Sequence, residues 1–467
     1  MQYVSRLMSA VRTLGIAPHT IVLAAGDLAA LLGTACVVFF LRSCMDCLPS
    51  AFYTRGLPLL LLAPLLGAAC GVYQRIAPTP HRELKRLAQF VTLLYVLALA
   101  LLFFSKSSDT ISRIFLVGAW ACSLITVPVM RYCIRRHWSR MPWWGTPLVI
   151  LDYGGKGKEF WRWLKCHPER DLVPVCLEPL PEQPAALRQT LSGLCARFPG
   201  ALALLPASPD MTQGGMDYLA EVSACFPGVI YVPPLPAGQR RQWFTVQDLG
   251  MAVGLLARRR LHDKWRQCVK RALDVTLTLL GMPVVLPVGA VICAAIVLSS
   301  PGSPFYCQRR IGRDGRKFTV YKFRSMVRNA DALLQRHLAS SPELRAEWEA
   351  DQKLRNDPRI FPVGRLLRKT SLDELPQLIN VLKGDMSLVG PRPIVTSEIA
   401  KYGPVFDDYC RVRPGITGFW QVSGRNDTTY EDRVAMDQYY VSNWSVWLDI
   451  WILAKTLPAV LHSDGAY

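Results

Sequence analysis

A length of 467 residues predicts two to four domains rather than one. The formal net charge of +19, from 54 Lys and Arg residues against 35 Asp and Glu residues, predicts anionic partners such as nucleic acid, anionic lipid or phosphate-bearing substrates. Since the 51% hydrophobic residues gather into long apolar stretches, we expect a membrane protein, and nucleic acid is not an expected partner.

Four apolar stretches lie within the first 135 residues, at approximately 20–41, 57–73, 87–104 and 114–132. Each has roughly the length that a helix needs to cross the hydrocarbon core of a bilayer. None is followed by a small-residue cleavage site, so we predict no signal peptide. Residues 1–145 are therefore expected to form a four-helix transmembrane bundle.

Basic residues beside these stretches predict the orientation of the bundle. Its two ends and its second loop are rich in cations, namely Arg6, Arg12, Arg75, Arg82, Lys85, Arg86, Arg131, Arg135, Arg136 and Arg140. The other two loops are poorer in Lys and Arg. Because cytoplasmic loops are enriched in these residues, both ends of the bundle are expected on the cytoplasmic side.

The pattern changes at residue 146. Apolar runs at 147–151, 172–177, 201–206 and 228–233 alternate with helix-like stretches, which predicts a parallel α/β sheet. We assign residues 146–255 to a Rossmann-like cytoplasmic domain with a regulatory or assembly role. A dinucleotide site is the alternative. The glycine pattern that begins at Gly155 and Gly157 argues against it, because Phe160 takes the third glycine position.

An apolar segment at 272–298 is long enough to span a membrane, yet basic residues lie on both of its sides. Pro283 and Pro287 lie within it, and each removes a helical hydrogen bond. Both observations fit a re-entrant helix that enters the membrane, breaks at these prolines and returns to the same face. An ordinary kinked span is the alternative.

The residues after this segment contain many groups of the kind that bind phosphate. They include Lys322, Arg324, Arg359, Arg365, Arg368, Lys369, Arg392 and Arg425. Among them lie two adjacent acids, Asp373 and Glu374. Ser371 and Glu374 have the spacing of a helix capping box, which is one interpretation. The other is that the acids bind Mg²⁺, which characteristically takes one or two carboxylates together with substrate phosphate oxygens.

The stretch 439–457 carries Trp444, Trp447 and Trp451 and predicts a helix. We expect this helix at the membrane interface, where tryptophan is enriched. A buried core helix is the alternative.

Several of these segments together resemble the bacterial polyprenyl-phosphate hexose-1-phosphate transferases. They are KRALD (270–274), the proline-broken segment, SPGSPFYCQRRIG (300–312), YKFRSM (321–326), DPRIFPVGRLLRKTSLDELPQLINVLKGDMSLVGPRP (357–393) and PGITGFWQVSGR (414–425). The preceding spans and α/β segment are similar to the long form of that family. Details such as GRND (424–427) and the SDGAY terminus are most similar to the members that transfer galactose-1-phosphate.

The resemblance implies roles for individual residues. Asp373 would be the catalytic nucleophile, and Glu374 would help to hold Mg²⁺ together with Asp373. The phosphate-binding residues would include Lys322, Arg368 and Arg392, and we add Arg324 and Arg425 as candidates. Residues 256–467 would form a monotopic catalytic domain.

The implied reaction transfers a hexose-1-phosphate from a UDP-hexose to undecaprenyl phosphate through a covalent aspartyl intermediate, with release of UMP. It would be the first membrane step in the synthesis of O-antigen, capsule or exopolysaccharide. We expect a multi-pass homodimer in the bacterial inner membrane, in contact with membrane lipid, with its catalytic domain on the cytoplasmic face. The alternatives are a glucose-1-phosphate transferase, a membrane-anchored sugar-nucleotide dehydratase and a non-catalytic sugar-nucleotide-binding scaffold.

Overall fold

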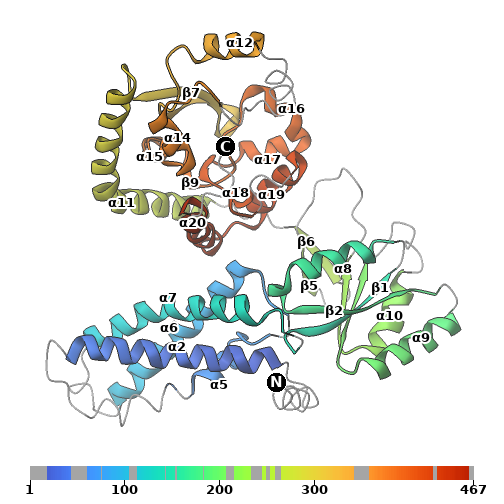
Figure 1. Cartoon of the computed structure of the whole chain (residues 1–467). Coiled ribbons are helices and arrows are strands. Elements are labelled where there is room, and N and C mark those ends of the chain that lie inside the picture. The colour runs from blue at the N-terminus through green and yellow to red at the C-terminus, as the bar shows by residue number, and fades with distance from the viewer. Residues whose placement is uncertain are drawn as a thin grey trace. The chain divides into compact units, whose positions relative to one another are not determined.

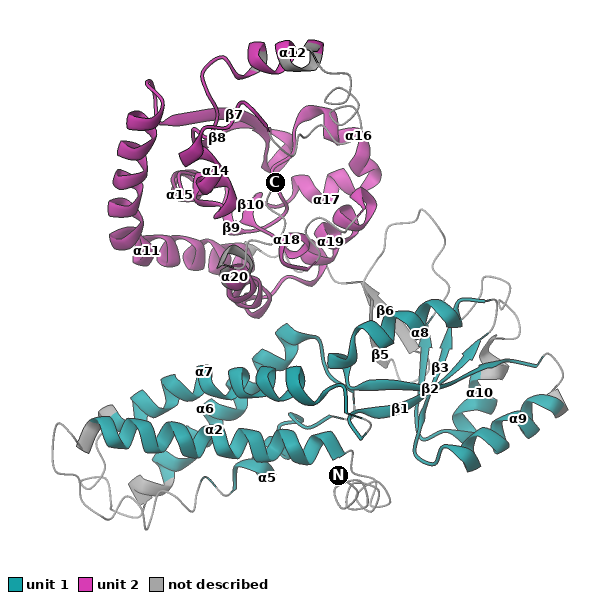
Figure 2. Ribbon diagram, in the orientation of Figure 1, with its two compact units in different colours: residues 1–237 teal, residues 238–467 magenta. Residues whose placement is uncertain are grey.

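The chain forms two compact units, Met1–Ala237 and Gly238–Tyr467 (Figures 1 and 2). A computed structural model describes residues 18–43, 60, 62–74, 76–104, 113–141, 143–152, 155–181, 184–206, 215–232, 244–248, 253–257, 264–340, 357–423 and 429–461. The predicted bundle lies in the first unit, and the predicted catalytic residues lie in the second.

The first unit begins with a helical bundle. Its helices are α2 (Pro18–Ser43), α5 (Ala63–Ala69), α6 (Pro80–Phe104) and α7 (Arg113–Trp138), and the three long helices run side by side (Figure 1). Leu31, Phe90 and Val127 bring one fully buried side chain each from α2, α6 and α7 into a shared core. Three helices of the described residues are long and apolar enough to cross a membrane, with candidate spans at Pro18–Leu41, Phe115–Trp138 and Trp265–Ser299. The predicted second span, 57–73, lies partly outside the described residues.

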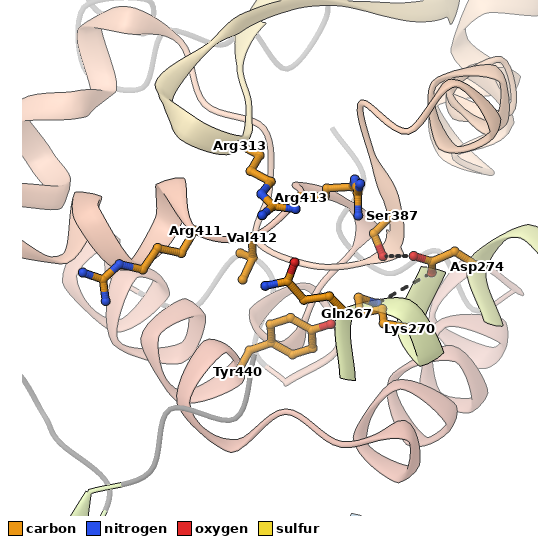
Figure 3. Close-up of a pocket in the computed structure, with 9 residues that line it drawn as sticks. All are labelled: Gln267, Lys270, Asp274, Arg313, Ser387, Arg411, Val412, Arg413 and Tyr440. Carbon is orange, nitrogen blue, oxygen red and sulfur yellow. Dashed lines mark hydrogen bonds and ion pairs between the residues drawn. The ribbon is translucent and has the colours of Figure 1, made fainter. Parts of the chain in front are cut away.

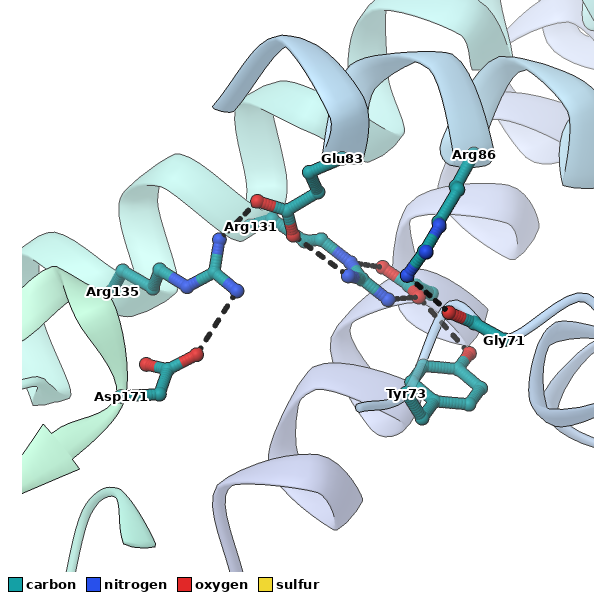
Figure 4. A network of polar contacts seen from close by, with 8 residues as sticks. Gly71, Tyr73, Glu83, Arg86, Arg131, Arg135 and Asp171 are labelled. Carbon is teal, nitrogen blue, oxygen red and sulfur yellow. Dashed lines mark hydrogen bonds and ion pairs between the residues drawn. The ribbon is translucent and has the colours of Figure 1, made fainter. Parts of the chain in front are cut away.

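Buried charges connect this bundle to the sheet that follows it (Figure 4). Arg131 of α7 donates to both carboxylate oxygens of Asp27 in α2, over 2.9 and 2.6 Å, and to Glu83 of α6 over 2.9 Å. Arg135, one turn later, donates to Glu83 and, over 3.1 Å, to Asp171 of the α/β domain. A buried charge is costly unless it is paired, so these five side chains must be satisfied as a set.

The α/β domain has a four-stranded parallel sheet in the order β2-β1-β3-β4. The strands are β1 (Thr146–Asp152), β2 (Leu172–Pro179), β3 (Leu202–Pro206) and β4 (Val229–Val232), and the helices are α8 (Gly157–Cys166), α9 (Pro184–Arg197) and α10 (Gly215–Cys225). A short turn, η2 (Pro168–Arg170), precedes β2. All four strands predicted from apolar runs are confirmed.

Alternate residues of β1 enter different cores, as the two-residue period of a strand requires. Leu148 and Ile150 pack with Leu164 of α8, whereas Val149 and Leu151 pack with helix residues that include Leu191 of α9. The sheet is therefore covered by helices on both faces, which explains why its strands are continuous apolar runs.

The loop between β1 and α8 argues against a dinucleotide site. Phe160, at the third glycine position, packs against the sheet with the α8 core. The backbone N–H of Gly157, at the start of α8, donates to Oδ1 of Asp152 over 2.8 Å. N–H groups at the N-terminus of a helix are the groups that bind phosphate in dinucleotide sites. Here one of them is already bonded to the carboxylate of Asp152.

The second unit contains three pairs of short strands and nine helices in the described residues. The strands are β5 (Phe244–Asp248), β6 (Val253–Ala257), β7 (Phe305–Ile311), β8 (Lys317–Phe323), β9 (Ser387–Val389) and β10 (Gly415–Thr417). The helices are α11 (Lys264–Ser299), α12 (Ala330–Ser340), α14 (Pro362–Lys369), α15 (Gln377–Lys383), α16 (Ile399–Tyr402), α17 (Phe406–Cys410), α18 (Phe419–Ser423), α19 (Tyr430–Asn443) and α20 (Val446–Leu461), where the four-residue α16 is a single turn. The single turns η5 (Arg313–Gly315), η6 (Leu372–Glu374), η7 (Thr396–Glu398) and η8 (Gly403–Val405) connect them.

Helix α11 consists of two arms set at a marked angle (Figure 1). Pro283 and Pro287 lie inside it, where each removes a backbone N–H from the helical ladder. Both arms contact the rest of the second unit: Ser387 Oγ donates to Asp274 over 2.8 Å near one end, and Ile296 is fully buried against Phe323 near the other. Between these contacts the apolar side chains are exposed, among them Leu279, Leu280, Val284, Leu286 and Val291.

The tryptophan stretch forms parts of two helices rather than one, since α19 ends at Asn443 and α20 begins at Val446. Trp444 is 3% exposed, and its indole N–H donates to Asp449 over 3.0 Å. Leu448 and Ile452 are fully buried, and Trp451 packs partly buried against the same cluster. Trp444 thus lies in the protein core, whereas Trp447 and Trp451 are half-buried, and the interfacial placement of α20 stays a prediction.

Candidate active site

The acid pair lies in η6, a single turn between α14 and α15, and does not form the predicted capping box. The Ser371 side chain makes no capping hydrogen bond, and Ser371 has a positive φ of 56°. A left-handed backbone conformation is uncommon for a residue other than glycine. Strained conformations of this kind cluster at functional sites. The capping interpretation is wrong because Glu374 is engaged elsewhere.

Lys322 is the partner of the acid pair. Its Nζ donates to Oε1 of Glu374 over 2.6 Å and lies 3.9 Å from Oδ2 of Asp373. Strand β8 positions Lys322, since it is paired with β7 across its whole length. A buried cluster that includes Phe323, Phe361 and Leu367, with Leu372 packed against it, holds β8, α14 and η6 together beneath these polar groups.

Asp373 is the more enclosed of the two acids. Its side chain is 14% exposed, against 31% for Glu374. The pKa of Asp373 is raised to about 6, chiefly by burial and also by the charge of Glu374, while the charges of Lys322 and Arg368 act in the opposite direction. At neutral pH Asp373 is therefore mainly an ionised and poorly solvated carboxylate, which is the state that a nucleophile requires.

Arg368 of α14 is held beside this pair by Ser325. The Arg368 Nε donates to Ser325 Oγ over 2.9 Å, and the charge of Asp373 acts on the Arg368 guanidinium. The approach of α14 to this segment requires glycine at position 364, because a Cβ there would lie 2.1 Å from the Ser325 carbonyl oxygen. Sequence reasoning missed Ser325, although it lies within the YKFRSM motif.

If the site is catalytic, as the family resemblance of the sequence implies, Ser325→Ala is expected to lower its kcat about fivefold, because a single hydrogen bond contributes about 1 kcal/mol. Loss of the hydroxyl would leave the Arg368 guanidinium free to leave its position beside Asp373. Steady-state kinetics on purified enzyme in detergent would measure this, with the exposed Ser303→Ala as the control. An unchanged kcat would exclude a positioning role for Ser325.

The remaining predicted cations are placed differently. Arg324 donates to the carbonyl oxygens of Ser300 and Pro301, so its guanidinium holds the chain at the end of α11. Arg359 is buried in an ion pair with Asp357 over 2.6 Å. Arg392 lies near Arg310, whose pKa is lowered by burial and by this charge. Arg425 lies outside the described residues.

The carboxylates of Asp373 and Glu374 are the candidate ligands for Mg²⁺. No group of three His, Cys, Asp or Glu side chains suited to a metal occurs in the part of the chain that the structure describes. The adjacent carboxylates of Asp373 and Glu374 nevertheless fit this ion, because Mg²⁺ is commonly held by one or two carboxylates, water and substrate phosphates.

Comparison with known proteins identifies the family. The sequence profile of the bacterial sugar transferases matches residues 265–463, a range that contains the whole site. Over 405 residues the chain is 35% identical to a UDP-galactose-lipid carrier transferase from Erwinia amylovora, and the alignment covers 82% of each chain. The chain belongs to the bacterial sugar transferase family.

Other bacterial sugar transferases match a shorter stretch. An undecaprenyl-phosphate galactose phosphotransferase from Salmonella typhimurium is 52% identical over 199 residues, 43% of this chain and 42% of its own. A UDP-glucose:undecaprenyl-phosphate glucose-1-phosphate transferase from Escherichia coli is 41% identical over 208 residues, 43% of this chain and 41% of its own. The relatives thus include proteins named for galactose and proteins named for glucose.

Proposed function

We propose that this protein transfers a hexose-1-phosphate, galactose-1-phosphate in the first instance, from a UDP-sugar to undecaprenyl phosphate and releases UMP. The observation that carries the proposal is the contact of Lys322 with Asp373 and Glu374, within the family's matching region. The product is a lipid diphospho-sugar, the starting point for O-antigen, capsule or exopolysaccharide.

The main obstacle to this reaction is electrostatic repulsion, because both substrates are anions. Lys322 and Arg368 supply positive charge beside the acid pair and favour binding of the diphosphate. An oxygen of Asp373 attacks the phosphorus that carries the sugar, the bond to UMP breaks, and a sugar-phosphoryl aspartate forms. The phosphate oxygen of undecaprenyl phosphate then attacks the same phosphorus and releases Asp373 as a free carboxylate.

Asp373 and Glu374 would hold Mg²⁺, which would supply charge neutralisation at the diphosphate when bound. The Lys322 bond to Glu374 fixes the position of that carboxylate. We expect Glu374→Gln to impair transfer, with a defect that diminishes as the Mg²⁺ concentration is raised.

The pKa of Asp373 predicts the pH dependence of transfer. With a pKa of about 6, the ionised nucleophile is lost as pH falls through 6, so kcat should fall about tenfold per unit below that pH and level off above it. Lys322 lowers the pKa of Asp373, so Lys322→Gln should shift the acidic limb to higher pH. Rates of UMP release measured from pH 5 to pH 8 would check both. Lys317→Gln, at the exposed start of the same strand, should leave the profile unchanged, and an unshifted limb in Lys322→Gln would contradict the assignment.

The membrane arrangement is part of the proposal. We place the bundle as a multi-pass domain in the inner membrane, and α11 as a re-entrant helix that keeps all later residues in the cytoplasm. The contacts of both α11 arms with one unit, and the exposed apolar side chains between them, support this placement.

External labelling of single cysteines in cells would test this topology. Cysteines placed immediately before residue 264 and immediately after residue 305 should both be protected from a membrane-impermeant reagent. Labelling after residue 305 would make α11 an ordinary span and would overturn the re-entrant arrangement.

A direct assay distinguishes the sugars and the rival functions. Membranes that contain the protein would be incubated with undecaprenyl phosphate and with radiolabelled UDP-galactose or UDP-glucose in parallel. Label in the lipid phase with stoichiometric UMP identifies the donor. Binding without UMP release would support a scaffold, and a modified sugar nucleotide would support a dehydratase.

The mass of the detergent-solubilised protein would test the expected homodimer.

A further inference from the structure

A second cluster of cations lies in the second unit, outside the active site. It lines a hollow that is open to solvent (Figure 3). Of the nine lining residues, four are Lys or Arg and one is an acid, and none takes part in the site around Asp373. Lys270 and Gln267 come from the first arm of α11, whereas Arg313 comes from η5 and Arg413 from the segment before β10.

The positive charges in this hollow are only partly compensated. Arg413 donates through Nε to the carbonyl oxygen of Gly384 over 2.7 Å, and its pKa is lowered by burial and by the charge of Arg313. The buried Nε of Arg313 has no hydrogen-bond partner among the described residues. Its distance of 3.8 Å from Asp314 is too long for a hydrogen bond.

The acids nearby are already committed to other partners. Asp274 accepts hydrogen bonds from Ser387 Oγ over 2.8 Å and from the Leu388 N–H over 3.2 Å. Asp449 lies 2.8 Å from Lys270 and also accepts from Tyr440. Two arginines that repel each other are therefore kept together beside a cavity, an arrangement that a bound anion would stabilise.

The position of the hollow along α11 indicates where such an anion would come from. Exposed large apolar side chains of α11 flank the hollow: Trp265 precedes Lys270, and the continuous exposed set starts at Leu277, seven residues after Lys270. At 1.5 Å per residue, Lys270 and Leu277 lie about 10 Å apart along the helix axis. A lipid phosphate lies just outside the apolar core of a bilayer, so the hollow is within reach of headgroups.

We propose that this hollow is a second anion site, in which Arg313 and Arg413 bind a phosphate group with Lys270 and Gln267 at its border. The phosphate belongs to the headgroup of an anionic phospholipid or to a soluble phosphate compound. The site is separate in its residues from the one that the proposed transfer reaction uses, and only its headgroup source rests on the proposed membrane placement of α11.

The test compares two arginine variants of the full-length protein purified in neutral detergent. Arg313→Gln removes a charge from the hollow, and Arg316→Gln removes an identical charge from an exposed residue three positions away. Phosphatidylglycerol is titrated against phosphatidylcholine as the lipid probe, and inorganic pyrophosphate as the soluble probe. Binding is followed by the shift in Tm. Both variants keep the active site, so its contribution to binding is the same in each.

We expect Arg313→Gln to weaken binding of one probe about tenfold or more, with a smaller loss in Arg313→Lys and none in Arg316→Gln. If only phosphatidylglycerol binding is weakened, the ligand is a lipid headgroup. If only pyrophosphate binding is weakened, the ligand is a soluble phosphate compound. Gln267→Glu, which adds a negative charge to the hollow, should weaken binding of the same probe. This variant replaces Arg313→Gln in the test if Arg313→Gln does not fold. Equal affinities in the two arginine variants, or no binding of either probe to wild type, would overturn the proposal.

Discussion

Asp373→Asn is expected to lower sugar-phosphate transfer by on the order of 10⁴-fold, because the amide cannot attack phosphorus. Asparagine has nearly the same size as aspartate, and the side chain lies at the edge of a polar site rather than in the core, so the fold should survive. If the acids only stabilised a helix terminus, the substitution would cost about 1 kcal/mol or less and activity would remain.

Partial turnover identifies the nucleophile directly. Wild type given UDP-sugar without lipid should release UMP up to one equivalent and retain the sugar phosphate covalently, whereas Asp373→Asn should retain none. Asp314→Asn is a suitable control, since Asp314 is 62% exposed and has a positive φ that asparagine tolerates. Labelled sugar phosphate on another residue, or near-normal turnover by Asp373→Asn, would refute the assignment.

Arg131→Met should destabilise the first unit by about 3–5 kcal/mol, because it removes the cation paired with the buried Asp27 and one of the two cations paired with Glu83. Asp27 would lose two hydrogen bonds and Glu83 one. Unfolding of the detergent-solubilised protein would measure the loss. The double variant Asp27→Asn/Arg131→Met also removes the negative charge of Asp27. It should recover a substantial part of the lost free energy of unfolding.

Arg136→Gln provides the matched control on the same helix. Arg136 lies five residues after Arg131, and its side chain makes only a long hydrogen bond of 3.4 Å to the Tyr132 hydroxyl at an exposed position. Its replacement should change stability by less than about 0.5 kcal/mol. Equal effects of the two substitutions would show that the buried network does not stabilise the bundle.

The elements that sequence predicted well are those governed by burial of apolar runs. The strands of the α/β sheet are covered on both faces, so each is a short apolar run, and polar residues, glycine or proline lie close to its ends. The length of the apolar segment 272–298 and its two prolines were likewise visible in the sequence, and both prolines lie within α11. The acid pair was found because it lies in a dense set of cations and in a motif shared with a known family.

Where the structure adds to or departs from the expectations from sequence, the cause is contacts between residues far apart in the chain. Ser371 and Glu374 have the spacing of a capping box, but Lys322, 52 residues before Glu374, takes that carboxylate. Arg324 follows Lys322 by two residues and would share its face in a longer strand. Strand β8 ends at Phe323, however, and Arg324 turns to the carbonyl groups at the end of α11. The buried network around Arg131 escaped prediction for the same reason.

Asp27 and Arg131 also constrain how the chain enters a membrane during its synthesis. They lie within candidate spans, Pro18–Leu41 and Phe115–Trp138, and each alone would cost about 2.5–3.5 kcal/mol near the centre of an inserted helix. The two residues are 104 positions apart, so α2 emerges from the ribosome long before its partner exists. In the proposed topology, α2 is therefore expected to remain with the insertion machinery until α7 arrives, and the two helices should be released into the lipid together.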